Sequence, residues 1–196
     1  AIDLEHLGEL IEEYVKEKPE IKIPDDLSPA AFFPLKPANA EQEALYRKAT
    51  EKGVELVSGG KVAALTVAGG QGSRLGFDGP KGTYPIAPIT GKTLFQYFSE
   101  SIVRYREKYS TSLNWYIMTS ALNHQQTVDF FTENDFFGLG ADTVFFFTQG
   151  TMPAISYEGK LLLAEKDSLA LAPDGHGGTL LALKNSGCLD TMKADG

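Results

Sequence analysis

The residues with the clearest chemical potential form a glycine-rich segment followed closely by a lysine. Residues 68–76 read Ala-Gly-Gly-Gln-Gly-Ser-Arg-Leu-Gly, and residues 80–82 read Pro-Lys-Gly. Glycines let backbone N–H groups approach a phosphate without a Cβ clash, while Arg74 and Lys81 supply charged donors for its oxygens. This spacing predicts a phosphate-binding loop.

Three other interpretations of the loop are weaker. The dinucleotide fingerprint Gly-x-Gly-x-x-Gly fails because Gly70 and Gly72 are followed by glycine only at Gly76, one residue late. Residues 91–93, Gly-Lys-Thr, imitate the end of a Walker loop, but position 86 is Ile where that loop requires Gly. A flexible turn without a ligand would not need the added arginine and lysine. Phosphate binding is therefore the stronger interpretation.

The segments around the loop predict an α/β fold. Residues 61–68 read as a buried strand that runs directly into the loop, and further strands are expected at 114–119 and 143–148. Helices are expected at 93–109, at 122–134 with Asn123 as its cap, at 179–185 and at 189–194, and a hairpin at 155–165. This order predicts a parallel sheet with helices on both faces, and it places the loop at the carboxyl edge, where such sheets bind ligands.

The N-terminal part has a different character. Residues 3–18 predict a helix with a narrow apolar stripe, residues 19–37 contain five prolines and predict an extended linker, and residues 39–53 predict a second helix that ends at Gly53. We therefore expect a helical N-terminal arm and linker over residues 1–58 and the main domain over residues 59–196.

Composition and charge exclude several classes of partner. The formal net charge of −8 disfavours nucleic-acid binding, and no apolar run approaches the roughly 20 residues of a membrane-spanning helix. Cys188 is the single cysteine and cannot form an internal disulfide, and the N-terminus lacks the pattern of a secretory signal. The sequence predicts a cytoplasmic protein without nucleic-acid or membrane partners.

The glycine-rich motif with its Pro-Lys resembles the signature of the sugar nucleotidyltransferases. Further stretches resemble one branch of them, the eukaryotic-type UDP-N-acetylglucosamine pyrophosphorylases and related UDP-sugar pyrophosphorylases: residues 92–96, 115–120, 149–154 and 172–178. The resemblance spans residues 39–196, and a helical segment ahead of the nucleotide-binding domain is also typical of the family.

The resemblance implies a fold, a reaction and its partners. The fold is a Rossmann-like, GT-A-like nucleotidyltransferase core with a mostly parallel sheet. The reaction joins UTP and a sugar 1-phosphate to give a UDP-sugar and pyrophosphate, assisted by Mg²⁺. The Gln149 and Gly175 context favours uridine over ATP, CTP or dTTP, which other branches with a similar glycine loop use.

The resemblance also assigns roles to individual residues. Val67, Ala68, Gly69 and Gly70 would hold the nucleotide. Arg74 would lie against the phosphates that leave as pyrophosphate, and Lys81 beside the α-phosphate. Gln149 and Gly175 would meet the uracil, where an amide and a backbone group can pair with the edge of the base.

The residue at position 176 leaves the identity of the sugar substrate undecided between two branches of the family. N-acetylhexosamine enzymes of the family commonly have Asn there, in contact with the sugar, whereas glucose-specific relatives commonly have Gly-His-Gly, as at residues 175–177 here. The flanking Pro-Asp-Gly and Gly-Gly still resemble the N-acetylglucosamine branch. We therefore expect N-acetylglucosamine 1-phosphate as the substrate, with glucose or galactose 1-phosphate as alternatives.

Two roles are open for His176. It contacts the sugar in this interpretation, or it serves only as a turn residue. A nucleotide-binding module without catalysis is the rival from another class.

In the family, the metal-binding aspartate lies shortly after the segment that matches residues 192–196, and most sugar contacts come later. We therefore expect the Mg²⁺ ligand beyond residue 196 and no metal ligand within the chain, which looks like the N-terminal part of a longer enzyme.

We predict that these 196 residues alone do not catalyse the reaction, because the metal ligand and much of the sugar pocket would be missing. The measurement is pyrophosphate release from UTP, N-acetylglucosamine 1-phosphate and Mg²⁺. Release above the rate of a protein-free control would contradict this prediction.

Overall fold

The computed structural model describes residues 3–17, 20 and 22–195. The chain divides into two compact units, one formed by residues 39–150 and 174–196 and the other by residues 1–38 and 151–173. The first unit therefore includes the second of the two expected N-terminal helices together with the sheet. No helix among the described residues has the length and apolar character needed to cross a membrane.

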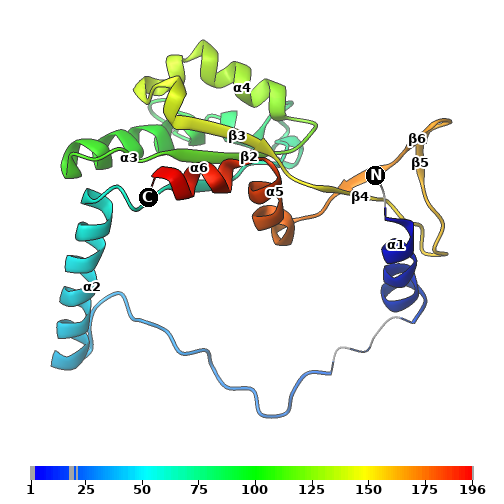
Figure 1. Cartoon of the computed structure of the whole chain (residues 1–196), viewed down its shortest axis with the longest axis horizontal. Helices are drawn as coiled ribbons and strands as arrows, with labels where there is room; N and C mark the ends of the chain where they lie inside the picture. Colours follow the sequence, from blue (N-terminus) through cyan, green and yellow to red (C-terminus); the bar gives the residue numbers. More distant parts are fainter. Residues whose placement is uncertain (1–2, 18–19, 21, 196) are drawn as a thin grey trace. The chain divides into compact units, whose positions relative to one another are not determined.

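The larger unit contains a three-stranded parallel sheet in the order β1-β2-β3. Its strands are β1 (Ala64–Val67), β2 (Trp115–Thr119) and β3 (Val144–Thr148), and Figure 1 shows β2 and β3 side by side. The register pairs Val67 with Met118, and Met118 with Phe147. The predicted parallel sheet is confirmed, although the first strand begins at Ala64 instead of residue 61.

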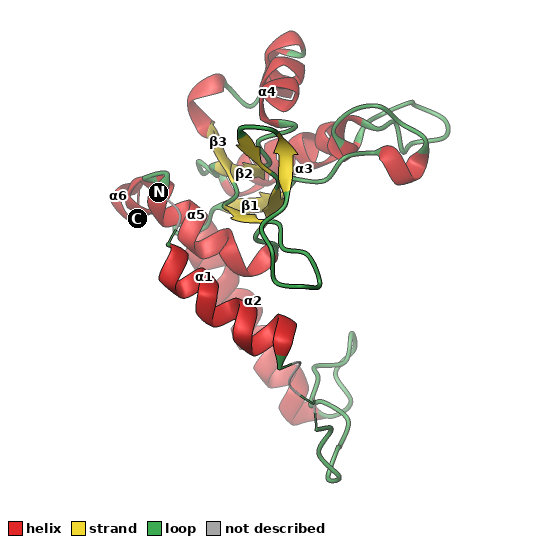
Figure 2. Ribbon diagram, turned by 90° about the vertical axis from the view of Figure 1, so that its right-hand side faces the viewer, coloured by secondary structure: helices red, strands yellow, loops and turns green. Residues whose placement is uncertain are grey.

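Helices cover both faces of this sheet, as predicted. The helices are α3 (Leu94–Tyr109), α4 (His124–Glu133), α5 (Thr179–Asn185) and α6 (Cys188–Asp195). Trp115 and Ile117 of β2 belong to one buried cluster, with residues of α3 and α4, whereas Tyr116 and Met118 belong to a second, with residues of α5 and α6. Successive strand side chains point to opposite faces, so the fully buried β2 divides the core into two layers. Figure 2 shows the three strands among these helices.

Helix α2 (Ala40–Ser58) is longer than expected. It begins as predicted, because the Asn39 side chain accepts a hydrogen bond from the Gln42 N–H at 2.9 Å. The predicted end at Gly53 is wrong. A single glycine costs a helix only about 1 kcal/mol, which a helix of 19 residues tolerates. The helix ends instead before Gly60, whose φ of +69° and 3.1 Å bond to the Val57 carbonyl form a glycine-based C-terminal cap.

The smaller unit contains α1 (Leu4–Ile11), a π-helical turn at Glu12–Lys16, and short antiparallel strands. Strand β4 (Thr151–Pro153) pairs with β7 (Leu171–Pro173), and β5 (Leu163–Glu165) pairs with β6 (Ser168–Leu169). The predicted hairpin at 155–165 is confirmed by the bridge between Ile155 and Leu161. The described residues between 20 and 38 contain no helix or strand, as expected for the linker, and Lys18, at the end of the expected first helix, lies outside the described residues.

Packing makes one glycine of the larger unit sensitive to substitution. Gly82 is buried, and a Cβ placed on it would overlap the ring of Phe95. That ring is 1% exposed and packs edge-on against Phe131 at a centroid distance of 5.1 Å. The ring therefore has no free space into which it could move.

We predict that Gly82→Ala destabilises the protein by about 1 to 3 kcal/mol, through overpacking of the core. The matched control is Gly53→Ala, because nothing lies within 4 Å of a Cβ on Gly53 and alanine is the better helix former. That variant should gain about 0.5 to 1 kcal/mol. Urea unfolding measures both, and equal free energies of unfolding for the two variants would contradict the prediction.

Candidate functional site

The glycine-rich loop begins where β1 ends. Val67 is the last residue of β1, and the N–H of Ala68 donates to the carbonyl of Met118 at 2.7 Å. The last bond to the neighbouring strand therefore lies one residue beyond β1, and the chain leaves the sheet at Gly69. This confirms that the loop lies at the carboxyl edge of the parallel sheet.

The loop is closed on itself by two backbone hydrogen bonds. The N–H of Gly72 donates to the carbonyl of Gly79 at 2.8 Å, and the N–H of Lys81 donates to the carbonyl of Gly70 at 3.0 Å. Phe77 packs on Gly72 so closely that a Cβ there would lie 2.7 Å from a ring carbon. The two parts of the motif that carry Arg74 and Lys81 thus form one folded unit.

The first amides of this loop are unused. The N–H groups of Gly69, Gly70 and Gln71 donate to no residue that the structure describes. Backbone N–H groups normally find an acceptor, and consecutive free ones form a concavity that binds anions. This is the backbone feature expected of a phosphate-binding loop.

Both predicted cations belong to this loop. The Lys81 Nζ lies 3.8 Å from the position of a Cβ on Gly70, so its ammonium lies over the loop. Arg74 lies in the short 3-10 turn Ser73–Leu75. Both side chains are exposed, and neither is hydrogen-bonded or ion-paired to any described residue. They are available to neutralise an incoming anion.

Gln149 lies directly beside the loop, as the predicted site requires. It follows β3, and its N–H donates to the Thr119 carbonyl at 2.8 Å. Its side-chain amide lies against Gly69, where a Cβ would be 2.7 Å from the Gln149 Oε1. A Cβ at position 69 would therefore displace this amide from its observed position.

Asp174 connects Gly175 to the same region. The N–H of Asp174 donates to the carbonyl of Gly150 at 3.2 Å, and its carboxylate occupies the space that a Cβ on Gly150 or Gly178 would need. Gly175 follows with φ of 72° and ψ of −165°, a combination open essentially only to glycine. Gly175 comes directly after Asp174, whose N–H is bonded to Gly150, and Gly150 comes directly after Gln149. His176 is exposed and begins the 3-10 turn His176–Gly178.

Sequence reasoning missed two residues here. Asn123 does not cap α4 with its side chain as expected, but bonds to the carbonyls of Ala68 and Gly70 in the loop. Asp174 receives no role from its sequence pattern, yet one of its carboxylate oxygens is buried without a described hydrogen-bond partner. Local sequence patterns hold no signal for the Asn123 contact, because it joins segments more than 50 residues apart.

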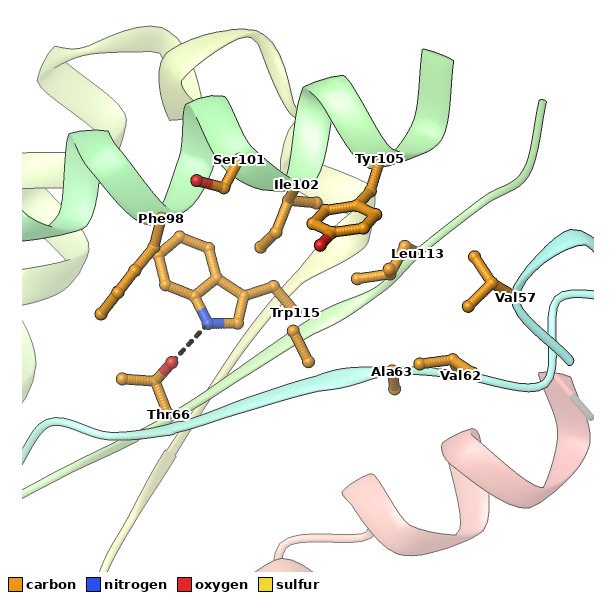
Figure 3. A pocket seen from close by; sticks show the side chains of 11 residues that line it. Val57, Val62, Ala63, Thr66, Phe98, Ser101, Ile102, Tyr105, Leu113 and Trp115 are labelled. Carbon is orange, nitrogen blue, oxygen red and sulfur yellow. Dashed lines mark hydrogen bonds between the residues drawn. The ribbon is translucent and has the colours of Figure 1, made fainter. Parts of the chain in front are cut away.

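A separate apolar pocket of about 320 Å³ lies between α3 and β1 (Figure 3). Its lining contains no charged side chain, and the Trp115 indole N–H donates to the Thr66 hydroxyl at 2.9 Å on its wall. It offers no charge for a phosphate. Among the described residues, no group of three or more His, Cys, Asp or Glu side chains could hold a metal ion.

Comparisons with known proteins agree on one family. The family model described as UTP–glucose-1-phosphate uridylyltransferase matches residues 5–196. UDP-N-acetylglucosamine diphosphorylase 2 of Arabidopsis thaliana is 41% identical over 155 residues, 74% of this chain and 31% of that protein. UDP-N-acetylglucosamine pyrophosphorylase of Saccharomyces cerevisiae is 39% identical over 138 residues, 68% of this chain and 29% of that protein.

A solved structure shows the same likeness. The uridine diphosphate N-acetylglucosamine pyrophosphorylase of Trypanosoma brucei is 30% identical with a TM-score of 0.65, covering 74% of this chain and 30% of that one. The chain spans about a third of the length of the curated relatives it matches.

We predict that Gly175→Ala strains the turn beside Gln149 and destabilises the protein by about 1 to 3 kcal/mol, because its backbone conformation excludes a Cβ. Gly177→Ala is the matched control, since nothing lies within 4 Å of its Cβ position and its φ is not in the left-handed region. Chemical denaturation measures both variants. The prediction is wrong if Gly175→Ala unfolds at the same denaturant concentration as the control.

Proposed function

The chain belongs to the UTP–glucose-1-phosphate uridylyltransferase family, and on this basis we propose that it forms the nucleotide-binding part of a UTP-dependent sugar-1-phosphate uridylyltransferase. The enzyme would convert UTP and N-acetylglucosamine 1-phosphate into UDP-N-acetylglucosamine and pyrophosphate. The names of the relatives that are 39–41% identical support this choice of sugar.

The observation that supports the proposal most directly is the composition of the loop. Three amides at residues 69–71 that have no acceptor among the described residues lie at the carboxyl edge of the sheet, together with the Lys81 ammonium over Gly70 and the Gln149 amide against Gly69. This set provides donors for phosphate oxygens beside an amide that can pair with the edge of a base. A nucleoside triphosphate combines both chemical groups.

The proposed reaction is a displacement at phosphorus. An oxygen of the sugar phosphate attacks the α-phosphorus of UTP in line, the bond to the bridging oxygen breaks, and pyrophosphate leaves. The protein needs no covalent nucleophile, because positioning and charge neutralisation supply most of the rate enhancement in such transfers.

Individual residues take the following roles in the proposal. Val67, Ala68, Gly69 and Gly70 hold the nucleotide, and Lys81 stabilises charge at the α-phosphate. Arg74 neutralises the leaving pyrophosphate. Gln149 and the backbone of Gly175 read the uracil, and the exposed His176 faces the sugar.

Magnesium belongs to the proposal only as an expectation. The described residues form no cluster suited to a metal ion, so we assign no step of the reaction to a metal held by them.

A UDP-glucose or UDP-galactose pyrophosphorylase is the second candidate, favoured by His176 between two glycines. A panel of sugar 1-phosphates tested on the complete enzyme distinguishes the two, because the preferred sugar should have the highest kcat/KM.

We predict that this chain binds UTP and that Lys81→Ala weakens binding about 10- to 100-fold, the value of losing charge-assisted hydrogen bonds to phosphate. Lys48→Ala removes an equal charge from the exposed surface of α2 and should bind like the wild type. Isothermal titration calorimetry measures all three proteins.

ATP serves as the ligand control in the same titration. Tighter binding of ATP than of UTP would contradict the choice of uridine. Equal affinities of the Lys81→Ala and Lys48→Ala proteins for UTP would contradict the role of Lys81.

A further inference from the structure

Asn123 is a fully buried polar residue between β2 and α4. Neither the predicted cap nor the proposed reaction accounts for it, since its side chain makes no capping bond to α4. Its neighbours are instead Ser120, in the same turn, and the glycine-rich loop.

The orientation of its amide is unambiguous. The Oδ1 accepts the Ser120 N–H at 2.8 Å and the Ser120 hydroxyl at 3.0 Å. The Nδ2 donates to the carbonyls of Ala68 at 3.0 Å and Gly70 at 3.3 Å. A backbone N–H can only donate and a carbonyl can only accept, so the reverse orientation would lose at least three of these four bonds.

These bonds set the direction of two peptide groups in the loop. In a planar trans peptide, the carbonyl of one residue and the N–H of the next point in opposite directions. Because Asn123 holds the carbonyls of Ala68 and Gly70, the N–H groups of Gly69 and Gln71 point away from it. Those are two of the three loop amides that have no acceptor among the described residues.

One of these carbonyls is also a hydrogen-bond partner of Lys81. The carbonyl of Gly70 accepts both the Asn123 amide and the Lys81 N–H. A change at Asn123 therefore alters the acceptor that anchors the backbone of Lys81, the residue whose ammonium lies over the loop.

We propose that Asn123 is a positioning residue of the nucleotide site: by holding the carbonyls of Ala68 and Gly70, it directs the Gly69 and Gln71 amides toward the phosphates of the nucleotide. The inference rests on the proposed function, because it assigns the ligand of these amides. Asn123 itself does not touch the ligand.

The test compares three variants of the chain. Asn123→Ala removes both donors and acceptors, while Asn123→Asp keeps an oxygen for Ser120 and replaces only the donor. Ser99→Ala is the matched control, because Ser99 is equally buried and its hydroxyl donates to a backbone carbonyl, that of Phe95 at 2.9 Å, away from the loop. Thermal unfolding identifies any variant that fails to fold.

Two measurements are made on each folded variant. Amide resonances of Gly69 and Gln71 in ¹H–¹⁵N spectra report the loop without any ligand, and calorimetry reports the UTP dissociation constant. We expect both Asn123 variants to shift these resonances and to raise the dissociation constant about tenfold or more, the value of a lost hydrogen bond or two. Ser99→Ala should do neither.

The outcomes separate this inference from the proposed function. Unchanged loop resonances in Asn123→Ala, or wild-type resonances in Asn123→Asp, would overturn the inference, as would shifted resonances with unchanged UTP affinity. Should the wild-type chain bind no UTP, the proposed function of the chain fails and the phosphate assignment fails with it. The ligand-free spectra still decide whether Asn123 orients the loop.

Discussion

Two hydrogen bonds at the carboxyl edge of the sheet bring the candidate site together. The N–H of Ala68 donates to Met118, and the N–H of Gln149 donates to Thr119, each one residue beyond the end of its strand. Parallel strands end at the same edge, so these bonds start the two loops on either side of β2 at the same level. The contact between Gly69 and the Gln149 amide follows from this register.

The absence of side chains at particular positions then decides how closely the segments approach. The ring of Phe95 packs against Gly82 where a Cβ would lie, and the carboxylate of Asp174 packs in the same way against Gly150 and Gly178. In each case a neighbouring side chain occupies the volume that a Cβ would take. This packing couples the core to the site. Phe95 packs with Trp115 and Phe131 in the core and also contacts Gly82, the residue after Lys81.

The charge of the loop contrasts with that of the whole chain. The formal net charge is −8, yet Arg74 and Lys81 are exposed and have no partner among the described residues. Most of the ion pairs that lysines form in the structure, such as Lys52 with Glu55, join exposed side chains on one element and contribute little to stability. Two cations without a described partner, on a loop with three amides that have no described acceptor, suit an anionic ligand.

The sequence alone determined the order of strands and helices, the parallel sheet and the position of the glycine-rich loop at its carboxyl edge, because hydrophobic period and glycine spacing are local properties. It also predicted Arg74 and Lys81 as phosphate-binding cations from their spacing, and Gln149 and Gly175 as uracil contacts through a family resemblance. The predicted end of α2 at Gly53 is wrong for a local reason, because one glycine costs a helix little and the C-terminal cap forms at Gly60. Only the tertiary structure placed Asn123 under Ala68 and Gly70, because a contact across more than 50 residues depends on the register between β1 and β2, which no local pattern encodes.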